Sequence, residues 1–141
     1  MEWTQEDFTV TTDLSRFDMN FVVASLQELW RKGASPDKIA RAFGNSLCFG
    51  LFDGQRQIGC VRAVTDHEFV SWICDLYLDQ DYRGKGLGLW LMDCVKSHPD
   101  LIDTRLVFTS VPESEAFYRH IGYVPMKRGY AMPPRKRNAD A

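Results

Sequence analysis

The chain has 141 residues, 45% of them hydrophobic and 13% aromatic, which is the usual size of one domain and enough apolar content to form a core. Lysine and arginine total 17 against 19 for aspartate and glutamate, and this formal net charge of -2 gives no electrostatic basis for nucleic acid as the main partner. No apolar run approaches the roughly 20 residues that span a bilayer, so no membrane partner is expected.

The ends of the chain and its cysteines add to these expectations. Residues 1–7 are acidic where a signal peptide would be basic, so we expect a cytoplasmic protein. One domain is predicted over residues 1–132, followed by a flexible basic tail over residues 133–141 with the cluster Arg135-Lys136-Arg137. Four cysteines lie in apolar segments without a C-x-x-C pair, which favours buried thiols over disulfides or a metal site. They are Cys48, Cys60, Cys74 and Cys94.

Hydrophobic periodicity predicts the elements of the first half of the chain. Residues 8–11 alternate as a short strand does, and apolar residues recur at helical spacing over residues 17–30. A second helix is predicted over residues 36–43, with Ser35 as its N-cap. Short turns then join three strand-like segments, which predicts an antiparallel meander. Its strands are residues 47–52, 57–64 and 69–78.

Strands and helices continue in the second half. A helix is predicted from Gly86 to about Ser97 and a strand over residues 105–109. Residues 110–113 fit a capping box that opens a short helix, which Gly122 ends, and a last strand is predicted from residue 123. This order of elements predicts an α+β fold, a sheet with helices on its faces.

A glycine-rich turn before the helix that begins near Gly86 is the strongest functional signal. The run Arg83-Gly84-Lys85-Gly86-Leu87-Gly88 stands where the first N–H groups of a helix lack partners and the helix dipole is positive. Its three alternate glycines let a diphosphate approach the backbone, and its two basic residues add charge. The turn therefore predicts a ligand that carries phosphates.

Spacing distinguishes three kinds of phosphate-binding turn. A nucleoside-triphosphate loop requires G-x-x-x-x-G-K-[ST], which the run does not contain. A dinucleotide fingerprint requires a small residue where Leu89 stands and a parallel βαβ unit. The acyl-CoA loop of the GNAT superfamily of N-acetyltransferases, [QR]-x-x-G-x-[GA], matches at every fixed position. From Tyr82 to Gly88 the chain also resembles that family's common form Y-R-G-K-G-[IL]-G.

A second segment extends the resemblance. Residues 115–123 are similar to the family's A-x-x-[FL]-Y-x-x-x-G-[FY], in which the tyrosine lies near the CoA sulfur, and Tyr118 is the matching residue. A phenol with an ordinary pKa of about 10 can donate a proton to a departing thiolate. The family often has Asn and Ala where this chain has Val111 and Ser114, so some CoA contacts are expected to differ. A tyrosine that only packs in the core is the alternative for Tyr118.

The resemblance covers residues 47–130 and implies the GNAT fold, with a mixed, mostly antiparallel sheet of about six to seven strands flanked by about four helices. It implies acetyl-CoA as co-substrate, no metal, and direct acetyl transfer to a primary amine of a small molecule or peptide in a ternary complex. Residues 72–78 look like a small bacterial subgroup, and a monomer or homodimer is expected. A non-catalytic acyl-CoA-binding sensor is the alternative function, but retention of both the glycine turn and Tyr118 argues against it.

In the family, the strand before the turn is splayed, and its backbone pairs with the pantetheine arm. Leu76, Tyr77 and Leu78 match that segment, and a backbone N–H of Tyr77 or Leu76 would stabilise the oxyanion. Asp75 is the candidate base because strand alternation places it on the face of Ile73 and Tyr77, where desolvation suits a base.

Several assignments in the candidate site remain open. Asp75 could instead form an ion pair with Arg62 across the sheet, and His67 and His120 are the other candidate bases. The acceptor pocket of the family is commonly formed by the first two helices and the strand-connecting loops, and the sequence does not identify the acceptor. The residues that this chain offers there are Trp30, Arg31, Phe43, Asn45 and Phe49.

Overall fold

The computed structural model describes residues 1–134. The cluster Arg135-Lys136-Arg137 and most of the predicted basic tail lie outside the described residues. Two compact units are present, one from Met1 to Phe108 and one from Thr109 onward. Among residues 1–134, the first unit contains a sheet and three α-helices, and the second contains one short α-helix.

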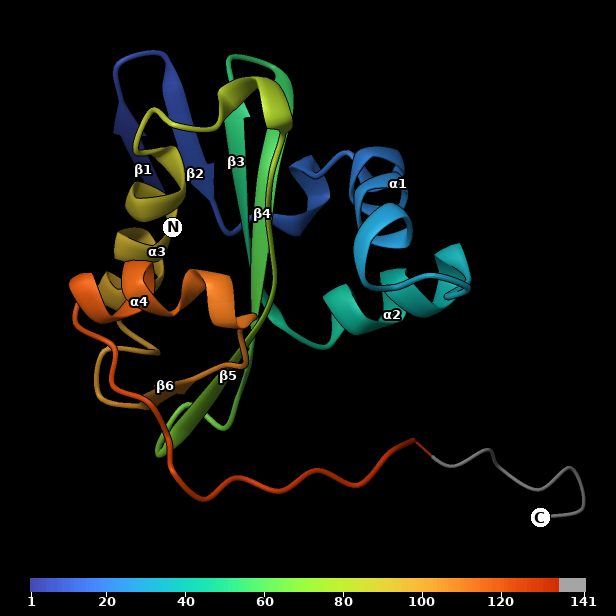
Figure 1. Ribbon diagram of the computed structural model, residues 1–141. Coiled ribbons are helices and arrows are strands. Elements are labelled where there is room, and N and C mark those ends of the chain that lie inside the picture. Colours follow the sequence, from blue (N-terminus) through green and yellow to red (C-terminus); the bar gives the residue numbers. More distant parts are fainter. Residues whose placement is uncertain (135–141) are drawn as a thin grey trace, which may run out of the picture. The chain divides into compact units, whose positions relative to one another are not determined.

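One mixed sheet forms the centre of the first unit (Figure 1). Its strands lie in the order β1-β2-β3-β4-β5-β6. Neighbouring strands are antiparallel from β1 to β5, and β6 is parallel to β5. The predicted meander and the mostly antiparallel sheet are therefore confirmed. The strands are β1 Glu2–Gln5, β2 Phe8–Thr11, β3 Leu47–Asp53, β4 Arg56–Thr65, β5 Val70–Leu78 and β6 Arg105–Val107.

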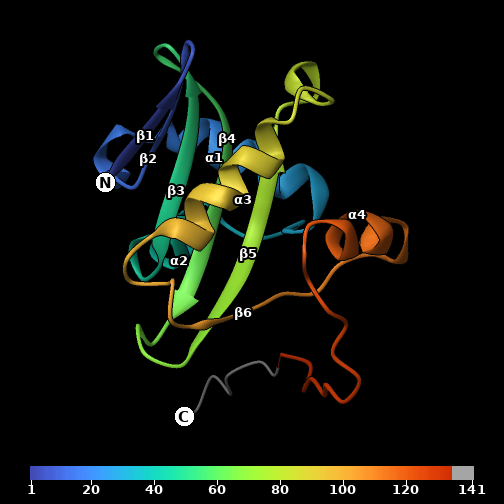
Figure 2. The same cartoon turned by 90° about the vertical axis from the view of Figure 1, so that its left-hand side faces the viewer.

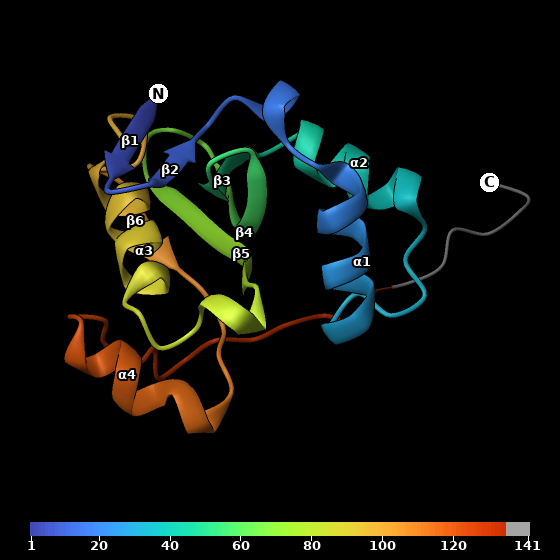
Figure 3. The same ribbon diagram turned by 90° about the horizontal axis from the view of Figure 1, so that it is seen from above.

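Three helices cover the two faces of this sheet. Helices α1 (Met19–Leu29) and α2 (Pro36–Gly44) lie on one face, and α3 (Leu87–Ser97) lies on the other (Figure 3). Figure 2 shows α3 crossing in front of β3, β4 and β5. The predicted N-cap of α2 is confirmed, because the Ser35 hydroxyl accepts the Lys38 N–H at 3.2 Å. Short 3-10 turns, η1 (Leu14–Arg16) and η2 (Gln80–Tyr82), precede α1 and α3.

Apolar stripes of these helices form the core. On one face Val22 and Leu26 of α1 pack with Phe43 of α2, and all three are at most 1% exposed. On the other face Leu91 and Val95 of α3 are fully buried. Burying each such side chain contributes about 1.5–3 kcal/mol, which fixes both helix layers against the sheet.

The first strand was not predicted. Three of the four residues of β1 are exposed, and only Trp3 turns inward, where its ring stacks on Phe49 at 5.9 Å between centroids. An edge strand with a single inward residue leaves no alternation to detect. The turn to β2 places Glu6 at a φ of 54°, in the left-handed region.

Predictions for the end of the chain need correction. The predicted strand at residues 105–109 ends at Val107, and the predicted strand from Tyr123 is wrong, because residues 123–134 contain no strand. Three prolines in that stretch have no N–H to donate to a ladder. The capping box is also wrong: a 3-10 turn, η3 (Pro112–Ser114), leads into α4 (Glu115–His120), and neither has a side-chain cap.

Candidate functional site

Strand β5 is distorted by a bulge at the point where a splayed strand is predicted. Asp75 and Leu76 together lie opposite the single residue Val61 of β4, because the pairing register shifts there. Asp75 has a φ of 57°, a left-handed conformation that residues other than glycine seldom adopt. A bulge interrupts the ladder and bends its strand. Backbone strain of about 1–3 kcal/mol persists only where other contacts hold the residue, and Asp75 has such contacts.

Beyond the bulge, β5 presents an open edge within the first unit. β6 pairs with β5 only from Val70 to Trp72, because β6 ends at Val107. Among residues 1–108, no strand pairs with that side of β5 from Ile73 to Leu78. The backbone there offers N–H and C=O groups to an extended ligand, which can add to a sheet as a further strand does.

The glycine turn leads from this open edge to the start of α3. Gly84 and Gly86 have φ values of 80° and 79°, and Gly86 is the N-cap of α3 without any side-chain cap. The first helical N–H to find a helical partner is that of Trp90, which bonds the Gly86 carbonyl at 3.0 Å. The N–H groups of residues 87–89 therefore have no helical acceptor, and the positive end of the helix dipole lies at the turn.

The glycines provide a test of whether a phosphate-bearing ligand fits this turn. A Cβ atom built at Gly84, Gly86 or Gly88 meets no atom within 4 Å. The first two positions need glycine for their positive φ. Gly88 has neither a positive φ nor a crowded neighbourhood, so nothing within the chain requires glycine there. A ligand in direct contact with the backbone does require it, and the turn fits a diphosphate.

The basic and aromatic side chains hold the turn in place. Arg83 donates from Nε to the Leu78 carbonyl at 3.0 Å, which ties the turn to the end of β5. The Tyr82 hydroxyl donates to Asp53 at 2.8 Å, and this bond raises the pKa of the phenol above its usual value. Lys85 Nζ lies 5.4 Å from the centre of the Tyr82 ring. Both cations of the motif are therefore next to the N-terminus of α3.

The Asp75 carboxylate is a buried hub, with a side chain only 3% exposed. It accepts hydrogen bonds from Arg62 Nε at 2.6 Å, Arg31 Nε at 3.0 Å and Trp30 Nε1 at 2.9 Å. The ion pair with Arg62, predicted as the alternative to a base role, is present. Arg31 and Trp30 were predicted near the acceptor but not as partners of Asp75, because more than 40 residues separate them in the sequence.

The bulge places the Asp75 side chain on a different face of the sheet from the one predicted. Ile73 pairs with Ala63, which alternates along β4 with Arg62. Asp75 contacts Arg62, so its side chain lies on the opposite face from Ile73 and not on the same one. Tyr77 does share the face of Asp75, and its ring meets Phe21 of α1 edge to face at 5.8 Å. A left-handed residue within a strand breaks the alternation on which the prediction rested.

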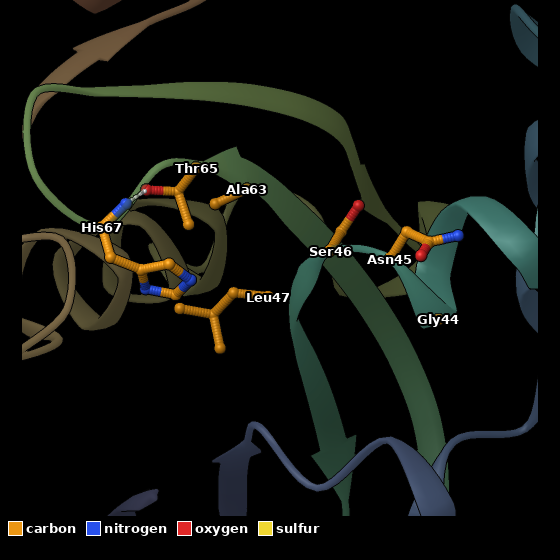
Figure 4. A pocket seen from close by; sticks show the side chains of 7 residues that line it. All are labelled: Gly44, Asn45, Ser46, Leu47, Ala63, Thr65 and His67. Atoms are coloured by element: carbon orange, nitrogen blue, oxygen red, sulfur yellow. Dashed lines mark hydrogen bonds between the residues drawn. The ribbon is translucent and has the colours of Figure 1, made fainter.

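His67 lies at the far end of β5 from the glycine turn. It occupies the β4–β5 turn with Nδ1 3.5 Å from an Asp100 carboxylate oxygen. An extended strand rises about 3.3 Å per residue, so Leu76 is roughly 20 Å beyond Val70, the first residue of β5. A hollow of about 340 Å³ at the same end includes His67, Thr65 and Asn45 in its wall (Figure 4). This hollow is separate from the open edge of β5.

Two other predicted acceptor residues belong to the core. Phe43 and Phe49 are fully buried, with no exposed surface. Trp30, by contrast, is 49% exposed. The side chain of Arg31 is 42% exposed. Of the predicted acceptor residues, these two lie next to the bulge.

Tyr118 and His120 lie on α4 of the second unit. Tyr118 is half-buried, and burial raises the pKa of its phenol above the usual value of 10.0. Its ring meets those of Phe117 and Tyr123 edge to face, with centroids 5.3 and 6.1 Å away. Because its pKa is raised, the phenol is protonated at neutral pH, as a proton donor must be.

The cysteines are poor nucleophiles. Burial raises the pKa of Cys48 to about 12 and that of Cys94 to about 11. Burial likewise raises the pKa values of Cys60 and Cys74. Because the thiolate is the reactive form, an acyl-cysteine route is disfavoured. In the described residues, no helix is long and apolar enough to cross a membrane, and no three His, Cys, Asp or Glu side chains are grouped to hold a metal.

Comparison with known proteins places the chain in a family. Residues 44–125 match the acetyltransferase (GNAT) domain. A Gibberella zeae protein named as an acetyltransferase is 24% identical over 145 residues, covering 85% of this chain and 81% of the relative. A Gracilaria tenuistipitata protein named as an uncharacterised N-acetyltransferase is 32% identical over 94 residues, covering 62% of this chain and 51% of the relative.

A solved structure shows the same fold. The crystal structure of a Xanthomonas campestris acetyltransferase assigned to the GNAT family superposes with a TM-score of 0.80 at 28% identity. The superposition covers 88% of this chain and 93% of that one. The matched domain, the relatives and the fold together show that the chain belongs to the GNAT acetyltransferases.

Proposed function

We propose that this protein transfers the acetyl group of acetyl-CoA to a primary amine of a small molecule or peptide, by direct attack in a ternary complex in the cytoplasm. The observation that carries the proposal is the continuity of the open β5 edge with the glycine turn at the start of α3. The open β5 edge suits an extended amide-bearing chain. The glycine turn suits a diphosphate. Acetyl-CoA carries both groups and supplies an activated thioester.

Binding is assigned to the turn and to the end of β5. The N–H groups at the start of α3, from Leu87 and Gly88, donate to the diphosphate, and Arg83 and Lys85 neutralise its charge. The backbone of residues 76–78 pairs with the pantetheine arm, as a neighbouring strand would. Arg83 serves both parts of this site, because it also bonds the Leu78 carbonyl.

Three roles remain for the chemical step. The N–H of Leu76 or Tyr77 stabilises the negative charge that develops on the acetyl oxygen. Tyr118 gives its proton to the departing thiolate, and its raised pKa keeps that proton in place beforehand. The amine must lose a proton before it attacks. Both Asp75 oxygens already accept hydrogen bonds from arginine or tryptophan, so Asp75 suits a positioning role better than a base, and water takes the proton.

Ligand-dependent unfolding tests the proposal with the whole chain. We expect acetyl-CoA to raise the thermal unfolding midpoint, because a ligand at 100 times its Kd adds about 2.7 kcal/mol, while NADH and ATP leave it unchanged. Release of free thiol with an amine panel then tests turnover. Binding without turnover of any amine would support the sensor, and no binding of acetyl-CoA would refute both functions.

A further inference from the structure

The end of α1 brings an exposed guanidinium to the β5 bulge. Arg31 follows Trp30, the C-cap of α1, and both side chains bond the Asp75 carboxylate. We infer that Arg31 binds an anionic group of the acceptor, so that the substrate class is an amine carrying a carboxylate or a phosphate. This inference rests on the proposed function.

The hydrogen bonds of Arg31 leave most of its donors unused. A guanidinium has five N–H donors in one plane, and the single donor on Nε is used by Asp75 Oδ1 at 3.0 Å. This bond fixes the orientation of the plane. The two terminal nitrogens donate to no residue from 1 to 134, and the side chain is 42% exposed. A fixed, exposed pair of terminal nitrogens matches the two oxygens of a carboxylate or phosphate.

The charges around the bulge favour an anion. Asp75 supplies one negative charge to two arginines, Arg31 and Arg62, so the cluster has a net charge of +1. Arg62 is only 11% exposed and donates from Nη1 to Ser46 Oγ at 3.1 Å, so its guanidinium is largely committed within the chain. The uncompensated positive charge is therefore presented at Arg31. It repels a plain alkylammonium and attracts an acceptor with its own negative group.

The position of the cluster relates this charge to the reacting end of the site. Asp75 immediately precedes Leu76, one of the two residues whose N–H is proposed to face the acetyl oxygen. Arg31 bonds Asp75 directly. An acceptor whose anionic group binds Arg31 should therefore have its amine only a few covalent bonds from that anionic group. The Trp30 side chain is held beside it by its own bond to Asp75, and it leaves surface for the apolar part of such a molecule.

A purely structural role for Arg31 makes a different prediction. If the side chain only supports Asp75, its loss affects every acceptor equally. If it binds an anion, its loss affects only acceptors that carry one. Matched amines that differ by the anionic group therefore separate the two roles.

The test measures kcat/KM by thiol release with the full chain and two pairs of acceptors. The pairs are phenylalanine with 2-phenylethylamine, and phosphoethanolamine with ethanolamine. We expect the anionic member of at least one pair to be preferred, and Arg31→Gln to lower its kcat/KM by about 10- to 100-fold, the range for a hydrogen bond to a charged group. The neutral partner should change less than about threefold. Arg41→Gln, the same change at an exposed residue of α2, is the control and should leave both unchanged.

Each other outcome has a defined meaning. Preference for the neutral amines, or equal losses for both members of a pair in Arg31→Gln, overturns the inference but leaves acetyl transfer intact. Absence of any acetyl-CoA-induced thermal shift overturns the proposed function itself. If no amine of the panel reacts, anion binding by Arg31 is tested by calorimetric titration of N-acetylphenylalanine and of inorganic phosphate into the CoA complex. Binding of either that Arg31→Gln abolishes supports the inference, and binding of neither refutes it.

Discussion

Trp30 and Asp75, which are 45 residues apart in the sequence, join the end of α1 to β5 through a hydrogen bond of 2.9 Å from the indole Nε1 to the carboxylate. The bond fixes the end of α1 over the bulge of β5, and Arg31 and Arg62 complete the cluster. The left-handed conformation of Asp75 is thus stabilised by three side chains from outside its own strand. This arrangement is the basis of the positioning role that we propose for Asp75.

Asp75→Asn should lower both stability and turnover while leaving the pH–rate profile unchanged in shape. Removing the charge leaves the largely buried Arg62 without a charged partner, and breaking such a pair costs roughly 3–5 kcal/mol. Asparagine retains one oxygen acceptor, so the lower end of this range is expected. Chemical denaturation measures the stability, and kcat against pH measures the profile. Loss of one limb of the profile would restore Asp75 as the general base.

Gly88→Ala should separate stability from binding. Gly88 has an ordinary helical backbone and open space around it, so alanine should increase stability by about 0.5–1 kcal/mol through its better helix propensity. The added methyl group lies where the diphosphate is proposed to touch the backbone, so acetyl-CoA affinity should fall at least tenfold. Unfolding curves and calorimetric titration measure the two effects. A stable variant with unchanged affinity would remove the diphosphate from this turn.

Gly86→Ala is the matched comparison. Its φ of 79° places a side chain in the left-handed region, which costs about 1–2 kcal/mol. This variant should therefore lose both stability and affinity, in contrast to Gly88→Ala. Equal stability changes in the two variants would contradict the conformational argument.

Sequence reasoning succeeded where the signal is local. The glycine turn, the Ser35 cap and the central meander each depend on residues close together in the chain, and the structure has all three. The predicted face of Asp75 failed because a bulge is set by contacts from another part of the chain. No local pattern signals that Trp30 and Arg31 bond a carboxylate 45 and 44 residues away.

Tyr118→Phe should reduce kcat by roughly 10²–10⁴-fold, the usual contribution of a general acid. Acetyl-CoA affinity should change little, because the ring and its edge contacts with Phe117 and Tyr123 are retained. Single-turnover kinetics and calorimetric titration provide the two measurements. A variant that turns over as fast as the wild type would exclude the phenol as the proton donor and favour a packing role.

His98 should make the stability of the first unit depend on pH. The ring is 8% exposed between Trp3 and Phe49, and its Nδ1 accepts the Asp100 N–H at 3.1 Å, so the neutral form is the one that fits. Burial lowers the pKa of His98 below its ordinary value of 6.5. The folded state then binds fewer protons than the unfolded state in the range between the two values.

The contribution of neutral His98 to the free energy of unfolding is therefore fully present above about pH 6.5. It decreases as the pH falls toward the folded-state pKa of His98. Denaturation curves between pH 7.5 and pH 5 should show this loss in the wild type, and His98→Gln should reduce the slope. His120→Gln, the same change at an exposed histidine, is the matched control. A slope that is the same in all three proteins would show that protonation of His98 is not coupled to folding.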